Sequence, residues 1–139
     1  MTATRFLLDK SAFARWSNPA VALVLDELDQ RGLLAVTAVI EMELLHSARD
    51  RKEADELQEM LSGFDYLPCP DEVWDRAKEL HRAALDRGFH RALSIPDLVI
   101  AACAERHRVT VLHYHGDFDM IGDLTGHPSQ WVVEPGSVP

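Results

Sequence analysis

Short apolar runs of strand length alternate with longer helical segments from one end of this sequence to the other. The predicted strands cover residues 5–8, 33–36, 64–68, 109–114 and 131–133. The predicted helices cover residues 12–16, 19–30, 37–49, 50–61, 72–87, 94–104 and 118–124. Parallel strands need a crossover segment between them, and that segment is usually a helix. The alternation therefore predicts an α/β fold with a central parallel β-sheet flanked by α-helices.

The segment 94–104 is predicted to be a capped, almost wholly apolar helix that carries one carboxylate, Asp97, in its first turn. Ser94 and Asp97 form an S-x-x-D capping pair. Thr37 and Asp71 are predicted to cap two other helices in the same way. A capping role accounts for Asp97 without any ligand, so a functional role depends on which other side chains lie near it.

Four acidic residues occupy positions where a parallel sheet binds ligands, outside the carboxyl ends of its strands. Asp9 follows the first strand, and Glu43 lies early in the helix after the second. Asp97 begins the helix before the strand 109–114, and Asp117 follows that strand. Each also has a structural interpretation: Asp9 an Asx turn, Glu43 a solvated helix face and Asp117 the start of the last helix.

Carboxylates that converge on one crevice repel one another unless a cation is present. Hard oxygen ligands without cysteine favour Mg²⁺ or Mn²⁺, and these ions position and activate water against a phosphodiester. The net charge of −9 argues against a general nucleic-acid coat protein, because phosphate binding depends on clustered Lys and Arg. The same net charge is compatible with a metal-dependent nuclease.

Composition predicts one domain over residues 1–139, because 47% of the residues are hydrophobic and no break in composition appears. The Pro- and Gly-containing tail, Glu134 to Pro139, is expected to be frayed. The chain has no apolar run of about 18 residues and no apolar signal-peptide core near Met1, so we expect no membrane span and a cytoplasmic location. Cys69 and Cys103 lack a metal-binding spacing and are interpreted as reduced structural thiols.

Four motifs resemble, in order, those of the PIN-domain ribonucleases, and most closely the VapC-type toxins of bacterial type II (VapBC) toxin–antitoxin systems. The motifs are LLDKSA at 7–12, the segment from Thr37 to ELLHSAR at 43–49, SIPDLVIAA at 94–102 and VLHYHGDF at 111–118. The resemblance covers about residues 5–133, nearly the whole chain. It implies a PIN-like fold, with a central parallel sheet between two layers of helices.

The resemblance also implies a function and a site. The implied function is a Mg²⁺- or Mn²⁺-dependent endoribonuclease that cuts single-stranded RNA (tRNA, rRNA or mRNA) to arrest translation, forms homodimers and is neutralised by a VapB antitoxin. By motif position, Asp9 and Asp97 are the principal metal ligands, and Glu43 completes the pocket and helps to orient water. Ser11 supports the first carboxylate by hydrogen bonding. We take Glu43 rather than Glu41 because the family places the acid directly before the Leu-Leu pair.

The fourth motif departs from the family pattern. Relatives commonly carry an acid-x-Asp-Phe element, and here His115 stands at the first acidic position. Asp117 can supply the missing carboxylate. Alternatively, His115 binds a metal or a phosphate, which would shift the metal preference toward Mn²⁺ or make activity more sensitive to pH.

Other side chains have both a functional and a structural interpretation. Trp16 and Trp74 are interpreted as core residues, with base stacking or contact with a partner as the alternative. His113 and His115 could form a zinc pair, but no further Cys/His cluster accompanies them. Four cations flank the motifs and either bind RNA or are solvated surface charges: Lys10, Arg15, Arg87 and Arg91.

Competing functions predict other residues. A receiver-type signalling domain would carry paired acids after the first strand and a Lys after a late strand, whereas here Asp9 stands alone and His115-Gly116 follows the late strand. A haloacid-dehalogenase-type phosphatase needs Asp-x-Asp, which Asp9-Lys10-Ser11 lacks. A non-catalytic binding module with the same fold stays open because of His115.

Overall fold

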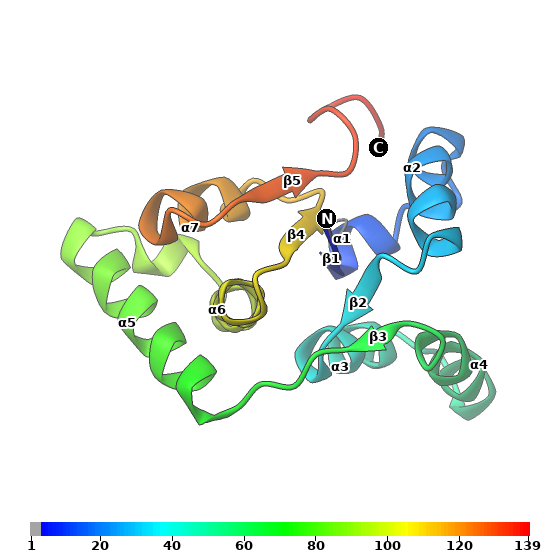
Figure 1. Ribbon diagram of the computed structural model, residues 1–139, viewed down its shortest axis with the longest axis horizontal. Helices are drawn as coiled ribbons and strands as arrows, with labels where there is room; N and C mark the ends of the chain where they lie inside the picture. Colours follow the sequence, from blue (N-terminus) through cyan, green and yellow to red (C-terminus); the bar gives the residue numbers. More distant parts are fainter. Residues whose placement is uncertain (1–3) are drawn as a thin grey trace.

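The computed structural model describes residues 4–139, in which five parallel strands form one sheet in the order β3-β2-β1-β4-β5 (Figure 1). The strands are β1 (Phe6–Leu8), β2 (Leu34–Val36), β3 (Asp65–Tyr66), β4 (Thr110–His113) and β5 (Ser129–Trp131). The helices are α1 (Lys10–Phe13), α2 (Pro19–Gln30), α3 (Ala38–His46), α4 (Arg51–Leu61), α5 (Asp71–Arg87), α6 (Ile95–His107) and α7 (Asp117–Thr125), with a 3₁₀ turn η1 (His90–Ala92). The predicted parallel α/β architecture is confirmed.

Alternate residues of the central strands bury their side chains on opposite faces of the sheet. Leu7 of β1 pairs with Val111 of β4, and both belong to a large core cluster that includes residues of α3, α5, α6 and α7. The next pair, Leu8 and Leu112, belongs to a second cluster with residues of α1 and α2. Because side-chain direction alternates along a strand, the sheet is covered on both faces, which gives the three-layer arrangement.

The middle of helix α6 is buried on all sides. Seven consecutive residues, Leu98 to Ala104, are buried. Figure 1 shows α6 nearly end-on between α5 and the central strands, and it also contacts α3, α7 and β4. A helix enclosed in this way has no solvent-facing stripe, which explains its almost wholly apolar sequence. Its start is fixed by Ser94, whose hydroxyl accepts a hydrogen bond from the Asp97 backbone N–H at 3.2 Å, as predicted.

One predicted strand and two predicted helix caps differ from the structure. The last strand covers Ser129–Trp131 rather than 131–133, because Trp131 pairs with His113 at the end of β4. The apolar residue Val132 lies beyond the strand and is buried in the second cluster. Pro70, not Asp71, is the N-cap of α5. Thr37 stands at the N-cap of α3 but makes no capping bond, since its hydroxyl lies 3.1 Å from the Cys69 Sγ.

The end of the chain lies against the body of the protein. The Tyr114 hydroxyl donates a hydrogen bond to the Val138 carbonyl at 2.9 Å and accepts one from the Val138 N–H at 3.2 Å. Arg15 Nε donates to the main-chain oxygen of Pro139 at 2.9 Å, and the Val138 side chain packs on the second cluster. These contacts run contrary to the expectation that the whole segment from Glu134 frays.

Other sequence expectations concern the thiols and the membrane. Cys69 and Cys103 are both free, and Cys103 is buried in α6. Within residues 4–139, no helix combines the length and the apolarity needed to cross a bilayer.

The burial of α6 predicts a large difference between two substitutions that each remove three carbon atoms. We expect Ile100→Ala, in the buried face of α6, to lower the free energy of unfolding by about 2–5 kcal/mol, because it leaves a cavity in a close-packed core. Leu23→Ala is the control, because Leu23 is 77% exposed on α2 and should cost less than about 0.5 kcal/mol. Denaturant unfolding measures both, and similar losses would show that α6 is not the centre of the core.

Candidate metal centre

A cleft of about 330 Å³ opens at the carboxyl ends of β1 and β4. The four predicted acids, the two predicted supporting residues and two of the predicted cations all line it: Asp9, Glu43, Asp97, Asp117, Ser11, His115, Lys10 and Arg15. Ala14 and Ser94 complete the lining. Arg87, at the end of α5, and Arg91, in η1, are exposed and are not among the lining residues. The topology thus brings together residues that are up to about a hundred positions apart in sequence.

Asp9 is held by the first turn of the chain after β1. Its side chain is 5% exposed, and its Oδ2 accepts hydrogen bonds from the Ser11 N–H at 3.0 Å and the Ser11 hydroxyl at 2.6 Å. The same hydroxyl oxygen accepts a bond from the Tyr114 N–H at 2.8 Å. Asp9 is therefore both the N-cap of α1 and a fixed carboxylate, and the predicted bond from Ser11 is present.

Glu43 reaches the cleft from α3 with one oxygen unused. Its Oε1 is buried and has no hydrogen-bond partner among the described residues. Burial raises the pKa of Glu43 above its ordinary value, and the negative charge of Asp9 adds to that effect, while Lys10 opposes it. Glu41, two positions earlier in α3, does not line the cleft. A buried, unpartnered carboxylate oxygen is what a missing ligand would satisfy.

Asp97 reaches the cleft from the first turn of α6. Burial raises its pKa to about 6, the nearby charge of Asp9 contributes next, and His115 opposes the shift. Like charges that share a partly buried site disfavour ionisation. A bound cation would reverse this effect and favour the ionised carboxylates.

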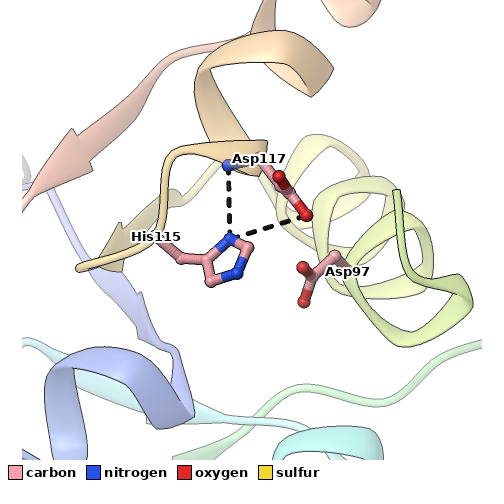
Figure 2. A group of neighbouring side chains, drawn as sticks. All are labelled: Asp97, His115 and Asp117. Atoms are coloured by element: carbon pink, nitrogen blue, oxygen red, sulfur yellow. Dashed lines mark hydrogen bonds and ion pairs between the residues drawn. The ribbon is translucent and has the colours of Figure 1, made fainter. Parts of the chain in front are cut away.

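Two groups of potential metal ligands share Asp97. The first joins Asp9, Glu43 and Asp97, and the second joins Asp97, His115 and Asp117; within each group the ligand atoms lie within 4.8 Å of one another. Figure 2 shows the second group, with the Asp97 carboxylate facing the His115 ring and Asp117. The first group offers oxygen atoms alone, which suits a hard divalent cation. With the unused oxygen of Glu43, this donor set fits such an ion.

The fourth motif forms a tight turn from β4 into α7. The His115 Nδ1 lies 3.2 Å from the Asp117 backbone N and 3.7 Å from the Asp117 Oδ2 (Figure 2). Asp117 is the first residue of α7, which agrees with its structural interpretation and begins the helix one residue before the predicted range. His113 points into the core between Phe118 and Trp131, and burial lowers its pKa to about 4. Since His113 is in the core and His115 lines the cleft, the two do not form a zinc pair.

A second groove, of about 390 Å³, lies between α5 and α6 and contains no predicted catalytic or metal-binding residue. Its lining includes Trp74, Leu85 and Ile95 but no carboxylate, so it lacks the chemistry of the cleft. Trp74 is 48% exposed there and is not a core residue, contrary to the first interpretation. Trp16 instead stacks on Phe64 at the edge of the second cluster.

One residue of the site region was missed by sequence reasoning. Tyr114 does not line the cleft, but it contacts two residues that do, Ser11 and Arg15. Nothing in its local sequence indicates this role, because its partners are about a hundred positions away.

Comparisons with known proteins agree on one family. Residues 6–124 match the PIN domain family. Ribonuclease VapC21 of Mycobacterium tuberculosis (strain ATCC 25618 / H37Rv) is 46% identical over 135 residues, which cover 96% of this chain and 98% of that protein. Ribonuclease VapC51 of the same strain is 39% identical over 136 residues, covering 98% of both. The crystal structure of DNA-bound VapBC from Salmonella typhimurium has a TM-score of 0.77 at 14% identity, covering 94% of this chain and 100% of that one; it shows a shared fold.

The raised pKa of Asp97 predicts how stability depends on pH when EDTA removes divalent cations. A folded-state pKa of about 6, above the ordinary 3.8, means that the folded protein binds this proton more tightly than the unfolded chain. Stability is therefore highest below pH 3.8 as far as Asp97 is concerned, and it falls as the pH rises to about 6. Asp97→Asn removes this loss, so its melting temperature should rise relative to wild type between about pH 4 and pH 7.

Thermal unfolding followed by circular dichroism at a series of pH values measures the effect. Asp123→Asn is the matched control, because Asp123 is exposed on α7 and does not line the cleft. If the melting temperatures of Asp97→Asn and wild type differ by the same amount at every pH in this range, the pKa of Asp97 is not raised in the folded protein.

Proposed function

This chain belongs to the PIN-domain family, among the VapC ribonucleases, and on that premise we propose that it is the toxin of a type II toxin–antitoxin pair. Its activity is the endonucleolytic cleavage of single-stranded RNA with Mg²⁺ or Mn²⁺. The observation that carries the proposal is the meeting of Asp9, Glu43 and Asp97 within 4.8 Å at the end of β1. Cleavage of tRNA, rRNA or mRNA in the cytoplasm would arrest translation.

Asp9 and Asp97 are the proposed principal ligands of the cation, with Glu43 and Asp117 as secondary ones. Bound there, a divalent cation supplies Lewis-acid activation of water and offsets the charge that grows on the phosphoryl oxygens. Ser11 donates to one oxygen of Asp9 and so fixes the direction of that carboxylate. No residue of the cleft has to form a covalent intermediate, because water can attack the phosphodiester in line.

Glu43 is the proposed group that orients the attacking water. Its Oε1 has no partner among the described residues, so it is available to accept a hydrogen bond from water. Burial and the charge of Asp9 raise its pKa, which makes the carboxylate a better proton acceptor. His115 and Asp117 share the fourth position, where His115 is proposed to contact the metal or a phosphate.

Cations at the cleft provide the proposed grip on RNA. Lys10 and Arg15 line the cleft, so they can reach the phosphates beside the scissile bond. Arg87 and Arg91 do not line the cleft. We propose that they contact a part of the RNA farther from the scissile bond. Local positive charge at an acidic site answers the objection that a chain of net charge −9 should repel RNA.

The proposed protein partner is a VapB-type antitoxin. Solved structures with this fold include a toxin–antitoxin complex from Klebsiella pneumoniae and VapBC-5 from Mycobacterium tuberculosis, a member of the VapBC family of toxin–antitoxin systems. An antitoxin that covers the cleft or its entrance would keep the nuclease inactive until the antitoxin is lost.

We propose that the protein forms a homodimer and that the two copies contact each other through the groove between α5 and α6. Trp74, Leu85 and Ile95 are exposed there. Helix α5 is acidic in its first turn (Asp71, Glu72) and basic in its last (Arg87). Two copies of α5 in antiparallel contact would therefore place opposite charges beside each other.

The two glutamates of α3 provide a matched test of the site. Glu43→Gln should lower metal-dependent RNA cleavage by about a hundredfold or more, because it removes a carboxylate from the cleft. Glu41→Gln, two positions earlier and outside the cleft, should leave cleavage near wild type. Asp9→Asn and Asp97→Asn should abolish cleavage, as should EDTA. Single-turnover cleavage of a fluorescent single-stranded RNA, with Mg²⁺ or Mn²⁺ restored, measures all four variants.

Undiminished cleavage by both Asp9→Asn and Asp97→Asn would disprove the site. RNA binding by the wild type without cleavage in either metal would instead favour the binding-module alternative that His115 keeps open.

Toxicity is tested in cells. Induced expression of this chain alone should slow bacterial growth, because RNA cleavage stops translation, whereas Asp97→Asn should be harmless. Co-expression of the small protein encoded beside it should restore growth. Culture density after induction gives the result, and sequencing of RNA ends identifies the target. Normal growth with a chain that cleaves RNA in vitro would argue against a toxin.

A further inference from the structure

His113, the last residue of β4, is buried in the core and is bonded to the turn that carries the fourth motif. Its side chain is 0% exposed, and its Nδ1 accepts a hydrogen bond from the His115 backbone N–H at 3.2 Å. A backbone N–H can only donate, so Nδ1 carries no proton in this arrangement, and the proton of the neutral ring is on Nε2. The ring of His113 is therefore an acceptor for the turn.

The other ring nitrogen of His113 has no polar partner. Nε2 is buried and makes no hydrogen bond within residues 4–139. The ring lies instead between two aromatic side chains, with its centroid 4.9 Å from that of Phe118 and 5.0 Å from that of Trp131. A buried donor without an acceptor costs free energy. Packing alone would favour an apolar side chain here, so the bond to His115 is the contribution that only a polar residue makes.

The bond from His113 begins a series of contacts through the turn between β4 and α7. The His115 Nδ1 accepts a bond from the Asp117 N–H at 3.2 Å, and the His115 carbonyl accepts one from the Phe118 N–H at 3.3 Å. Phe118, in the first turn of α7, packs back on the His113 ring. The ring therefore contacts both ends of the turn that places His115 and Asp117 in the cleft.

We propose that His113 is a positioning residue, which holds the backbone of His115 so that the side chains of His115 and Asp117 keep their places in the cleft. This inference rests on the proposed ribonuclease function. His113 does not line the cleft, so it acts through the turn rather than on the RNA. A displacement of about 1 Å at a reacting centre can cost about a hundredfold in rate, so a small shift of the turn is expected to lower kcat.

Asparagine and leucine provide a matched pair of substitutions at this position. Their side chains have the same branched shape, but only asparagine carries an oxygen that can accept the N–H two residues later, as in an Asx turn. His113→Leu should lower kcat/KM for single-stranded RNA at least about tenfold, mainly through kcat. His113→Asn should stay within about threefold of wild type. His113→Gln carries its amide one carbon farther out, past the position of Nδ1, and should behave like His113→Leu.

Stability separates positioning from a purely structural role. Asparagine buries an amide in an apolar place, whereas leucine buries only carbon, so His113→Asn should unfold at a lower denaturant concentration than His113→Leu. Positioning predicts the opposite order for cleavage. His127→Leu is the control, because the His127 Nε2 lies 2.6 Å from the Val109 carbonyl and outside the cleft. This control should have a lower melting temperature and a kcat/KM near wild type.

Hydrogen exchange gives a readout that needs neither RNA nor metal. The His115 amide should exchange with solvent faster in His113→Leu and His113→Gln than in wild type, because its acceptor is lost, and His113→Asn should restore the protection. NMR of isotope-labelled protein in EDTA measures these rates. The Asp9 amide, which is bonded to the Leu112 carbonyl at 3.0 Å, is the reference and should exchange alike in all four proteins.

The outcomes distinguish the two levels of inference. A wild-type protein without RNA cleavage in Mg²⁺ or Mn²⁺ overturns the proposed function and this inference with it. A cleaving wild type whose His113→Leu variant keeps the wild-type kcat/KM overturns the positioning role alone. A His113→Asn variant that loses tenfold or more also overturns it, whether or not the other two variants fold, since the acceptor would then not be what matters.

Discussion

Repulsion among three carboxylates is the constraint on which the rest of this structure depends. Ligand atoms of Asp9, Glu43 and Asp97 lie within 4.8 Å of one another in a partly buried cleft, and burial, followed by the charge of Asp9, raises the pKa of both Glu43 and Asp97. Folding alone does not favour such a group. It persists because the elements that carry the three carboxylates are well packed. Asp9 follows β1 at the centre of the sheet, and Glu43 and Asp97 lie on α3 and α6, which both contribute to the larger core cluster.

The proposed reaction places two opposed electrostatic requirements on the cleft. A divalent cation requires a concentration of negative charge, whereas a polyanionic RNA is repelled by it. The structure meets the two requirements with different side chains of one cleft: Asp9 is held by the N–H and hydroxyl of Ser11, and Arg15 donates to the Ser11 carbonyl and lies over the Tyr114 ring. A negative net charge is therefore compatible with binding RNA.

Sequence periodicity predicted the strands and helices whose hydrophobic pattern is visible within a short segment of the chain. The five strands and the burial of residues 98–104 follow from short apolar runs and from an apolar helix without a polar stripe. The strand at 131–133 was misplaced because Val132 is apolar through burial against α1 and α2, while the pairing with β4 ends at Trp131. The motifs placed the four acids in the cleft. They gave no sign of Tyr114 or of the tail, since the bond from Arg15 to Pro139 joins residues 124 positions apart.

The histidine at the fourth position changes the charge that the site presents. In the neutral ring, Nδ1 can accept the hydrogen bond from the Asp117 N–H at 3.2 Å, and the proton is then on Nε2. In the protonated ring, Nδ1 is a donor and faces the Asp117 Oδ2 at 3.7 Å instead. These two states exclude each other, and a metal ion at Nε2 requires a ring without a proton there. Both of these ring states carry a proton on Nε2, so a metal-ligand role for His115 requires the other neutral tautomer, in which Nδ1 holds the proton and Nε2 is free.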